Sequence, residues 1–150
     1  MNRSTGIHRC ALLGAALIAT AVILAEPSAR ADEMVAVTLA DKGMESMRMD
    51  LNAMQVKAGK VTFKVTNTSQ TLVHEFVVVK SDKPVESMLY NEDEKEIKED
   101  ALEVVNEIED IDPGKSGTLT VTLQPGSYIL LCNKAGHFKA GMVNRLTVIE

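Results

Sequence analysis

Most of the chain from residue 34 onward consists of short runs in which apolar and polar residues alternate, with turn residues between the runs. Val61–Asn67 alternates strictly, and Gly117–Leu123 sets Leu and Val against Thr in the same way. Neighbouring side chains of a strand point to opposite faces, so each run predicts a strand with one buried face. Turn residues interrupt the pattern at Lys57–Lys60, Asp112–Lys115 and Gln124–Gly126. This spacing predicts an all-β protein with antiparallel strands, either a sandwich or a barrel.

One acidic segment, Ser81–Ile111, departs from this pattern. Apolar residues such as Ile97 and Ala101 recur in it at helical spacing, which predicts a helix over Asp93–Glu103. Val104–Ile108 fits a strand equally well, so we expect a short helical insertion followed by a strand. Further strands are expected at Met34–Leu39, Leu72–Val79, Ser127–Cys132 and Asn144–Ile149.

The N-terminal segment has the three-part layout of a secretory signal peptide. Arg3 and Arg9 precede the uncharged run Cys10–Ala25, and small residues stand at Ala29 and Ala31. A membrane anchor is the alternative, but the run is shorter than the roughly 20 apolar residues that cross a bilayer. We therefore expect residues 1–31 to be a signal peptide and residues 32–150 to be a single domain that is periplasmic or secreted, free of the membrane and monomeric.

The charge and the cysteine content limit the classes of function that the chain can have. The net charge is −5, which argues against nucleic acid as a partner because phosphate binding needs a basic face. Of the chain's two Cys and three His, Cys10 and His8 lie in the predicted signal peptide. The domain therefore keeps one Cys, Cys132, and two His, His74 and His137. A lone thiol in an oxidising compartment is a liability unless it is buried or bound.

These scarce residues form a ligand pattern. Cys132, His137 and Met142 follow one another with four residues between each pair, and His74 lies on another expected strand. A thiolate, two imidazoles and a thioether are the ligands of a type 1 copper site. Taken singly, each residue has a plainer explanation: a buried histidine, an inert thiol, a core methionine. A thiol nucleophile paired with His137 would need an orienting group that the sequence does not reveal.

Two stretches carry a family resemblance. Residues 128–142 read YILLCNKAGHFKAGM, and residues 72–77 read LVHEFV. Both resemble the copper-binding segments of cupredoxins of the plastocyanin and azurin type, with a ligand-loop spacing similar to that of rusticyanin-like members. The resemblance implies a Greek-key β-sandwich and one-electron transfer, with no enzyme activity. It also implies one copper ion bound by His74, Cys132, His137 and Met142. A copper oxidase or nitrite reductase would need further histidines, and this domain has none to spare.

The sequence differs from plastocyanin and azurin at one position next to the expected ligands, and two further features suggest how a partner would dock. Glu75 follows His74 where plastocyanin and azurin have an Asn that ties the two copper loops together, and Asn133 is the candidate replacement. An apolar collar around His137 implies an electron port (Ala135, Gly136, Phe138, Ala140 and Gly141). The acidic run Glu92–Glu109 is either a solvated face or a docking surface for a redox partner such as a c-type cytochrome or a terminal oxidase.

A second group of soft side chains gives the alternative function. Met44, Met47, Met49 and Met54 lie close together in the sequence. Methionine commonly fills gaps in a core, but closely spaced thioethers also bind Cu(I). Copper binding by this group would indicate a copper-handling protein, a carrier or resistance factor without a dedicated role in electron transfer.

Overall fold

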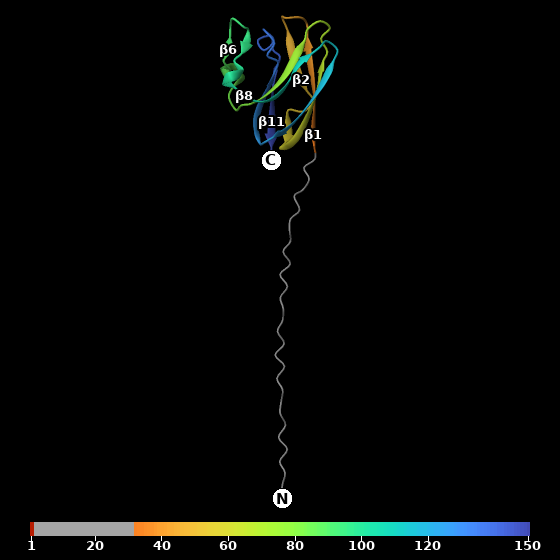
Figure 1. Cartoon of the computed structure of the whole chain (residues 1–150), viewed down its shortest axis with the longest axis vertical. Helices are drawn as coiled ribbons and strands as arrows, with labels where there is room; N and C mark the ends of the chain where they lie inside the picture. Colours follow the sequence, from red (N-terminus) through yellow and green to blue (C-terminus); the bar gives the residue numbers. More distant parts are fainter. Residues whose placement is uncertain (2–31) are drawn as a thin grey trace.

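The computed structural model describes Met1 and residues 32–150, which form two packed β-sheets (Figure 1). The predicted signal peptide lies outside the described residues, apart from Met1. One sheet has the strand order β2 (Met47–Leu51), β1 (Glu33–Asp41), β4 (Gly59–Asn67), β9 (Ser116–Leu123). The other has the order β3 (Gln55–Lys57), β11 (Val143–Ile149), β10 (Gly126–Leu131), β5 (His74–Lys80), β8 (Glu103–Ile111). Strands distant in sequence are neighbours in both sheets, and the all-β sandwich is confirmed.

The alternating pattern located most strands correctly. Each of the strongly patterned runs lies within an observed strand or overlaps one closely, and Val104–Ile108 lies within β8. The pattern missed β2 and β3, which are short strands at the edges of their sheets. Two pairings are parallel, β1 with β4 and β11 with β3, so the sheets are mixed rather than purely antiparallel.

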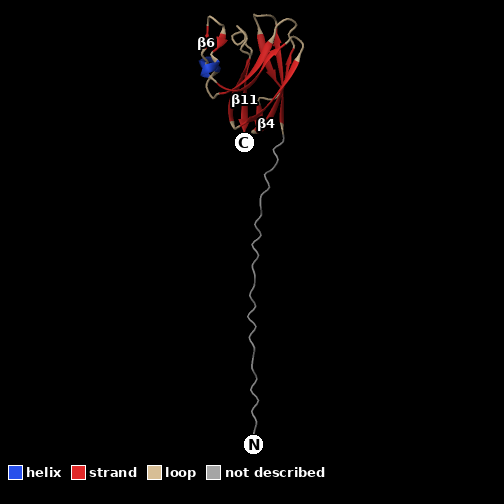
Figure 2. Cartoon of the chain, in the orientation of Figure 1, coloured by secondary structure: helices blue, strands red, loops and turns tan. Residues whose placement is uncertain are grey.

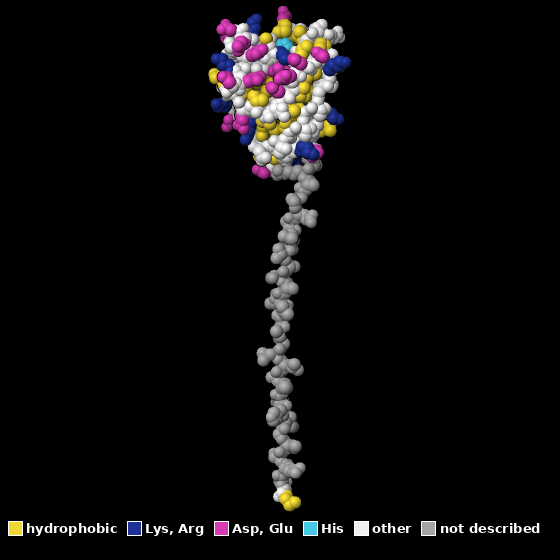
Figure 3. Space-filling view, viewed as in Figure 1, with side chains coloured by type: hydrophobic (Ala, Val, Ile, Leu, Met, Phe, Trp, Pro, Cys, Tyr) yellow, Lys and Arg dark blue, Asp and Glu magenta, His cyan; other side chains and the backbone are white. Residues whose placement is uncertain are grey.

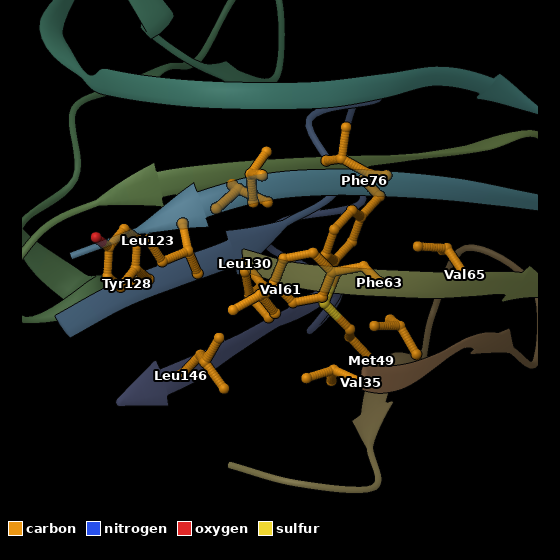
Figure 4. Close-up of a cluster of buried hydrophobic side chains, with 14 of the residues drawn as sticks. Val35, Met49, Val61, Phe63, Val65, Phe76, Leu123, Tyr128, Leu130 and Leu146 are labelled. Carbon is orange, nitrogen blue, oxygen red and sulfur yellow. The ribbon is translucent and has the colours of Figure 1, made fainter. Parts of the chain in front are cut away.

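The core lies between the two sheets and comes from the inward face of each strand. The rings of Phe63 on β4 and Phe76 on β5 meet at its centre, with 5.1 Å between centroids (Figure 4). Both side chains are fully buried, as are Val35 and Val61. Burying a phenylalanine side chain contributes about 2–3 kcal/mol to folding. This packing fixes β5 relative to the opposite sheet, and β5 carries His74.

β5 is buried on both of its faces. Val77 and Val79 point away from the main core and pack with Ile129 and Leu131 of β10 in a second apolar cluster. Side chains of the segment between β5 and β8 cover this cluster, among them Met88 and Leu102. Burial on two faces explains why residues 76–79 are continuously apolar instead of alternating.

The predicted helix over Asp93–Glu103 is wrong. That part of the chain forms a small hairpin, β6 (Tyr90–Asn91) with β7 (Glu96–Ile97), next to two short 3-10 turns, η1 (Val85–Ser87) and η2 (Glu99–Ala101). Figure 2 shows how little helix results. A helix here would align like charges four residues apart, as in Glu96 with Asp100 and Glu99 with Glu103, which destabilises it. Among the described residues, no helix is long and apolar enough to cross a membrane.

Candidate metal centre

Three chemically distinctive side chains meet at one end of the sandwich. His74 is the first residue of β5, and Cys132 directly follows β10, the strand that pairs with β5. His137 lies in the loop between β10 and β11. All three side chains are buried, with exposed fractions of 0%, 0% and 5% respectively. The sheet therefore brings together residues that lie 58 positions apart in the sequence.

The donor atoms of these residues are close enough to share one metal ion. His137 Nδ1 lies 3.4 Å from Cys132 Sγ, and His74 Nδ1 lies 4.0 Å from it. The two Nδ1 atoms are 3.0 Å apart. Two donors bonded to one ion at the usual protein distances of about 2.0–2.3 Å are separated by at most about 4.0–4.6 Å. The three donors satisfy this limit, and one sulfur with two imidazole nitrogens is the equatorial set of a blue copper site.

The β10–β11 loop returns to its starting point, and this return places Met142 beside the other residues. The Cys132 N–H donates to the Met142 carbonyl at 3.0 Å, and the Met142 N–H donates to the His137 carbonyl at 3.0 Å. Met142 is fully buried and packs in the same apolar cluster as Cys132. Its role as a fourth, axial ligand stays a prediction.

Glu75 does connect the two copper-binding segments, although a carboxylate cannot donate a hydrogen bond as an amide does. Its Oε1 accepts from the Asn133 N–H at 2.7 Å, and its own N–H donates to Cys132 Sγ at 3.3 Å. Lys134 Nζ lies 3.5 Å from Glu75 Oε2. Burial raises the pKa of Glu75 above its usual value, while the Asn133 N–H and Lys134 oppose this rise. The hydrogen-bonded link between the two copper-binding segments is therefore present, with the Glu75 side chain as its acceptor.

The Asn133 side chain binds the acidic insertion instead of replacing that tie. Its Oδ1 accepts from the Ile97 N–H at 2.6 Å, and its Nδ2 donates to the Ile97 carbonyl at 3.0 Å and to Glu99 Oε1 at 2.8 Å. The Gly136 N–H also donates to the Lys95 carbonyl at 2.7 Å. The insertion thus packs directly against the loop that carries Cys132 and His137.

Sequence reasoning missed Asp41, the last residue of β1. Its Oδ2 lies 3.2 Å from His74 Nε2, the ring nitrogen that faces away from Cys132. Burial would raise the pKa of Asp41, but hydrogen bonds from Ser69, Gly43 and His74 hold that pKa below its usual value. Asp41 is 33 residues from His74, and its surroundings in the sequence resemble an ordinary strand end, so no local pattern reveals the contact.

The four methionines differ in burial. Met47 and Met49 are buried at 6% and 2% exposure and belong to the main core. Met44 and Met54 are exposed at 50% and 58%. Gap filling in the core therefore accounts for the two middle residues.

Burial determines the protonation of the metal-free site. Desolvation raises the pKa of Cys132 to about 12, against the opposing effect of backbone hydrogen bonds from Glu75 and Lys134. Desolvation and the neighbouring His74 lower the pKa of His137 to about 4. At neutral pH the metal-free protein therefore holds a thiol and a neutral imidazole. Metal binding at this thiol must release a proton, so metal affinity is expected to rise with pH.

The low pKa of His137 predicts an acid-sensitive metal-free fold. An unfolded histidine titrates near 6.5, so between pH 6.5 and about 4 the unfolded chain binds the extra proton. The free energy of unfolding is therefore unaffected by the protonation of His137 above pH 6.5. It falls as the pH decreases toward 4, by about 3 kcal/mol at most. Urea unfolding of the metal-free protein at a series of pH values measures this loss. His137→Asn should show a smaller loss over the same window, and an equal loss in both proteins would contradict the assignment.

Comparison with known proteins agrees with this geometry. Residues 13–143 match the family model described as a cupredoxin-like domain. Auracyanin from Roseiflexus castenholzii is 25% identical with a TM-score of 0.58, and the match covers 79% of this chain and 97% of that one. Rusticyanin from Thiobacillus ferrooxidans is 17% identical with a TM-score of 0.61, covering 78% and 77%.

A third similar structure is that of a copper protein. Auracyanin A, a "blue" copper protein from Chloroflexus aurantiacus, is 16% identical with a TM-score of 0.58, and the match covers 79% of this chain and 99% of that one. No curated protein matches the sequence. At these identities the last two structures show the fold alone, while the family model spans most of the chain. The chain belongs to the cupredoxin-like family.

Proposed function

We propose that this protein is a one-electron carrier that binds a single copper ion through His74, Cys132, His137 and Met142. The observation that carries the proposal is the buried group of one thiol and two imidazoles, with all three donor atoms within 4.8 Å of one another. A copper ion bound there would supply a one-electron couple between Cu(I) and Cu(II). The thiolate and thioether suit Cu(I), and imidazole suits either oxidation state.

The protein's own part is to keep these donors in place. His74 begins one strand and Cys132 directly follows the strand paired with it, so a packed sheet sets their separation. Glu75 bonds to the residue after Cys132, and its N–H points at the sulfur. Hydrogen bonding to the cysteine sulfur is one of the factors that tune the potential of such sites. A site fixed in this way moves little between oxidation states, which favours fast electron transfer.

His137 is the proposed exit for the electron. It is the only one of the three site residues with any exposed surface, 5% of its area. Ala135 and Gly141 next to it are exposed, and Phe138 is half-buried. Figure 3 shows a histidine at the surface near the end opposite the C-terminus, with apolar side chains around it and acidic ones close by. A small apolar contact of this kind suits brief docking.

The acidic side chains beside this patch favour a basic redox partner such as a c-type cytochrome. Glu92, Asp93, Glu94 and Glu99 are all exposed on the insertion that packs against the site loop. Lys139, which flanks His137, is paired with Glu92 at 2.6 Å, and its Nζ lies 4.0 Å from the Tyr90 ring centroid. Opposite charges on the partner would speed encounter and still allow release. A terminal oxidase with a basic docking face fits the same chemistry.

We infer a periplasmic or secreted location from the predicted signal peptide. The burial of Cys132 is compatible with an oxidising compartment, because the thiol is shielded from disulfide exchange. The N-terminal sequence of protein recovered from the periplasm or medium should begin at Asp32. Retention of residues 1–31 on membrane-bound protein would favour the anchor instead.

The functional test is electron exchange by the copper-loaded protein. We expect one tightly bound copper per chain and rapid, reversible reduction by a basic c-type cytochrome. The alternative, a copper-handling protein, gains support only from the exposed Met44 and Met54. Additional bound Cu(I) that is lost in a double Met44→Leu, Met54→Leu variant, together with slow electron exchange, would overturn the carrier in favour of copper handling.

Replacing Met142 by Leu tests the proposed axial ligand without changing the three equatorial ligands. Leucine is close in volume, so the buried site should keep its packing and its visible absorption. Loss of the weak axial ligand should raise the reduction potential, which voltammetry measures. Met49→Leu is the matched control because Met49 is also buried in the main core. Equal potentials in the two variants would contradict an axial role for Met142.

A further inference from the structure

The two ring nitrogens of His74 have different partners. Nδ1 faces the donor group, 4.0 Å from Cys132 Sγ and 3.0 Å from His137 Nδ1. Nε2 faces Asp41 Oδ2 at 3.2 Å. The His74 side chain is fully buried and the Asp41 side chain is 7% exposed, so this carboxylate is largely withdrawn from water. A buried charge must be compensated by hydrogen bonds or by an opposite charge.

A chain of hydrogen bonds holds the Asp41 carboxylate in this orientation. Its Oδ1 accepts from the Gly43 N–H at 3.0 Å in the turn after β1. The Ser69 hydroxyl donates to the same carboxylate. Ser69 Oγ accepts from the N–H groups of Thr71 and Leu72 at 3.2 and 2.9 Å, which leaves its own proton free for Asp41. The Gly43 donor is a backbone group, and two backbone N–H groups orient the Ser69 hydroxyl, so the Asp41 carboxylate is held beside His74.

The carboxylate constrains which nitrogen of His74 carries the proton. A carboxylate accepts and cannot donate, so the hydrogen bond to it requires a proton on Nε2. When His74 is neutral, its Nδ1 then presents a lone pair to the donor group. Because the two Nδ1 atoms are 3.0 Å apart, a hydrogen bond between them then takes its proton from His137. The metal-free site therefore has a defined pair of tautomers, with His74 protonated on Nε2 and His137 on Nδ1.

We propose that Asp41 is a positioning residue of the metal centre: it fixes the tautomer and ring orientation of His74, and its negative charge favours Cu(II) over Cu(I). The second half of this statement rests on the proposed function, because it concerns copper. A metal-ligating histidine commonly donates its other N–H to a carboxylate, which raises the basicity of the ligand nitrogen. Asp41 supplies that carboxylate from β1, in the opposite sheet to β5.

The first test needs neither copper nor a substitution. A long-range 1H–15N NMR spectrum of the metal-free wild-type protein reports which nitrogen of each histidine is protonated. We expect His74 to be protonated on Nε2, with an unprotonated Nδ1 bonded to the His137 Nδ1 proton. Protonation of His74 on Nδ1 would overturn the proposal, whether or not the protein binds copper. This result therefore stands or fails independently of the proposed function.

The second test measures the charge. Asp41→Asn keeps the size of the side chain and removes its charge. We expect Cu(II) affinity to fall by roughly 10–100-fold and Cu(I) affinity to fall less. Each tenfold decrease in the ratio of Cu(II) affinity to Cu(I) affinity raises the reduction potential by about 59 mV. Glu45→Gln is the matched control, because Glu45 is an exposed carboxylate in the same β1–β2 connection. A shift in Asp41→Asn no larger than that in Glu45→Gln would overturn the assignment.

Discussion

Replacing Cys132 by Ser is expected to abolish the intense visible absorption of the copper-loaded protein and to remove most of its copper affinity. The absorption arises from charge transfer between a thiolate and Cu(II), and Cys132 is the single Cys among the described residues. A serine hydroxyl is a hard, neutral donor that does not ionise near neutral pH, so it replaces neither the charge nor the softness of the thiolate.

The measurement is a Cu(II) titration followed by absorption, with circular dichroism as a check on the fold. Serine nearly matches the size of cysteine, and Cys132 lies in a closely packed core, so the sandwich should form. Met49→Leu, in the same core, should bind copper as the wild type does and serves as the control. Full visible absorption in Cys132→Ser would place the chromophore elsewhere and exclude Cys132 as a ligand.

Replacing Gly141 by Ala is expected to destabilise the protein by about 2–5 kcal/mol, because two separate costs add at this position. Gly141 has a φ of +107°, a conformation that residues with a Cβ rarely adopt. An added Cβ would also lie 2.7 Å from the Met47 carbonyl oxygen, a backbone atom of β2 that cannot turn aside. The neighbouring Met47 N–H donates to the Ala140 carbonyl, so a shift there would also disturb the loop that carries His137 and Met142.

Gly136 provides the matched control in the same loop. Its φ of +83° is also positive, but an added Cβ would meet only the end of the flexible, exposed Met44 side chain at 3.3 Å. We expect Gly136→Ala to lose about 1–2 kcal/mol, the backbone cost alone. Urea unfolding of both metal-free variants measures the difference. Equal losses would mean that the close approach of the loop to β2 does not determine stability.

The sequence predicted what depends on short-range patterns. Period-two alternation located the long strands, since each must present one face to the core. The spacing of Cys132, His137 and Met142 was informative because a single loop carries all three. Predicting that His74 joins them relied on the scarcity of Cys and His in the domain and on the family resemblance, because no local pattern links β5 to that loop.

The features missed depend on contacts between distant segments. The insertion was predicted as a helix from apolar spacing, but Ile97 is buried because Asn133 bonds both its N–H and its carbonyl. The sequence put the link between the copper-binding segments in doubt because the Glu75 carboxylate has no N–H to donate. In the structure the carboxylate forms this link as an acceptor, from the Asn133 N–H. Asp41 reaches His74 only after β1 and β5 pack in opposite sheets. Such pairings arise from the tertiary fold and leave no trace in local composition.

The most direct test of the account is a crystal structure of the copper-loaded protein with anomalous scattering measured at the copper edge. We predict one copper peak, within bonding distance of His74 Nδ1, Cys132 Sγ and His137 Nδ1, with Met142 Sδ as a longer fourth contact. A peak bound by other residues, or a fully loaded crystal in which the Cys132 sulfur does not touch the metal, would contradict it.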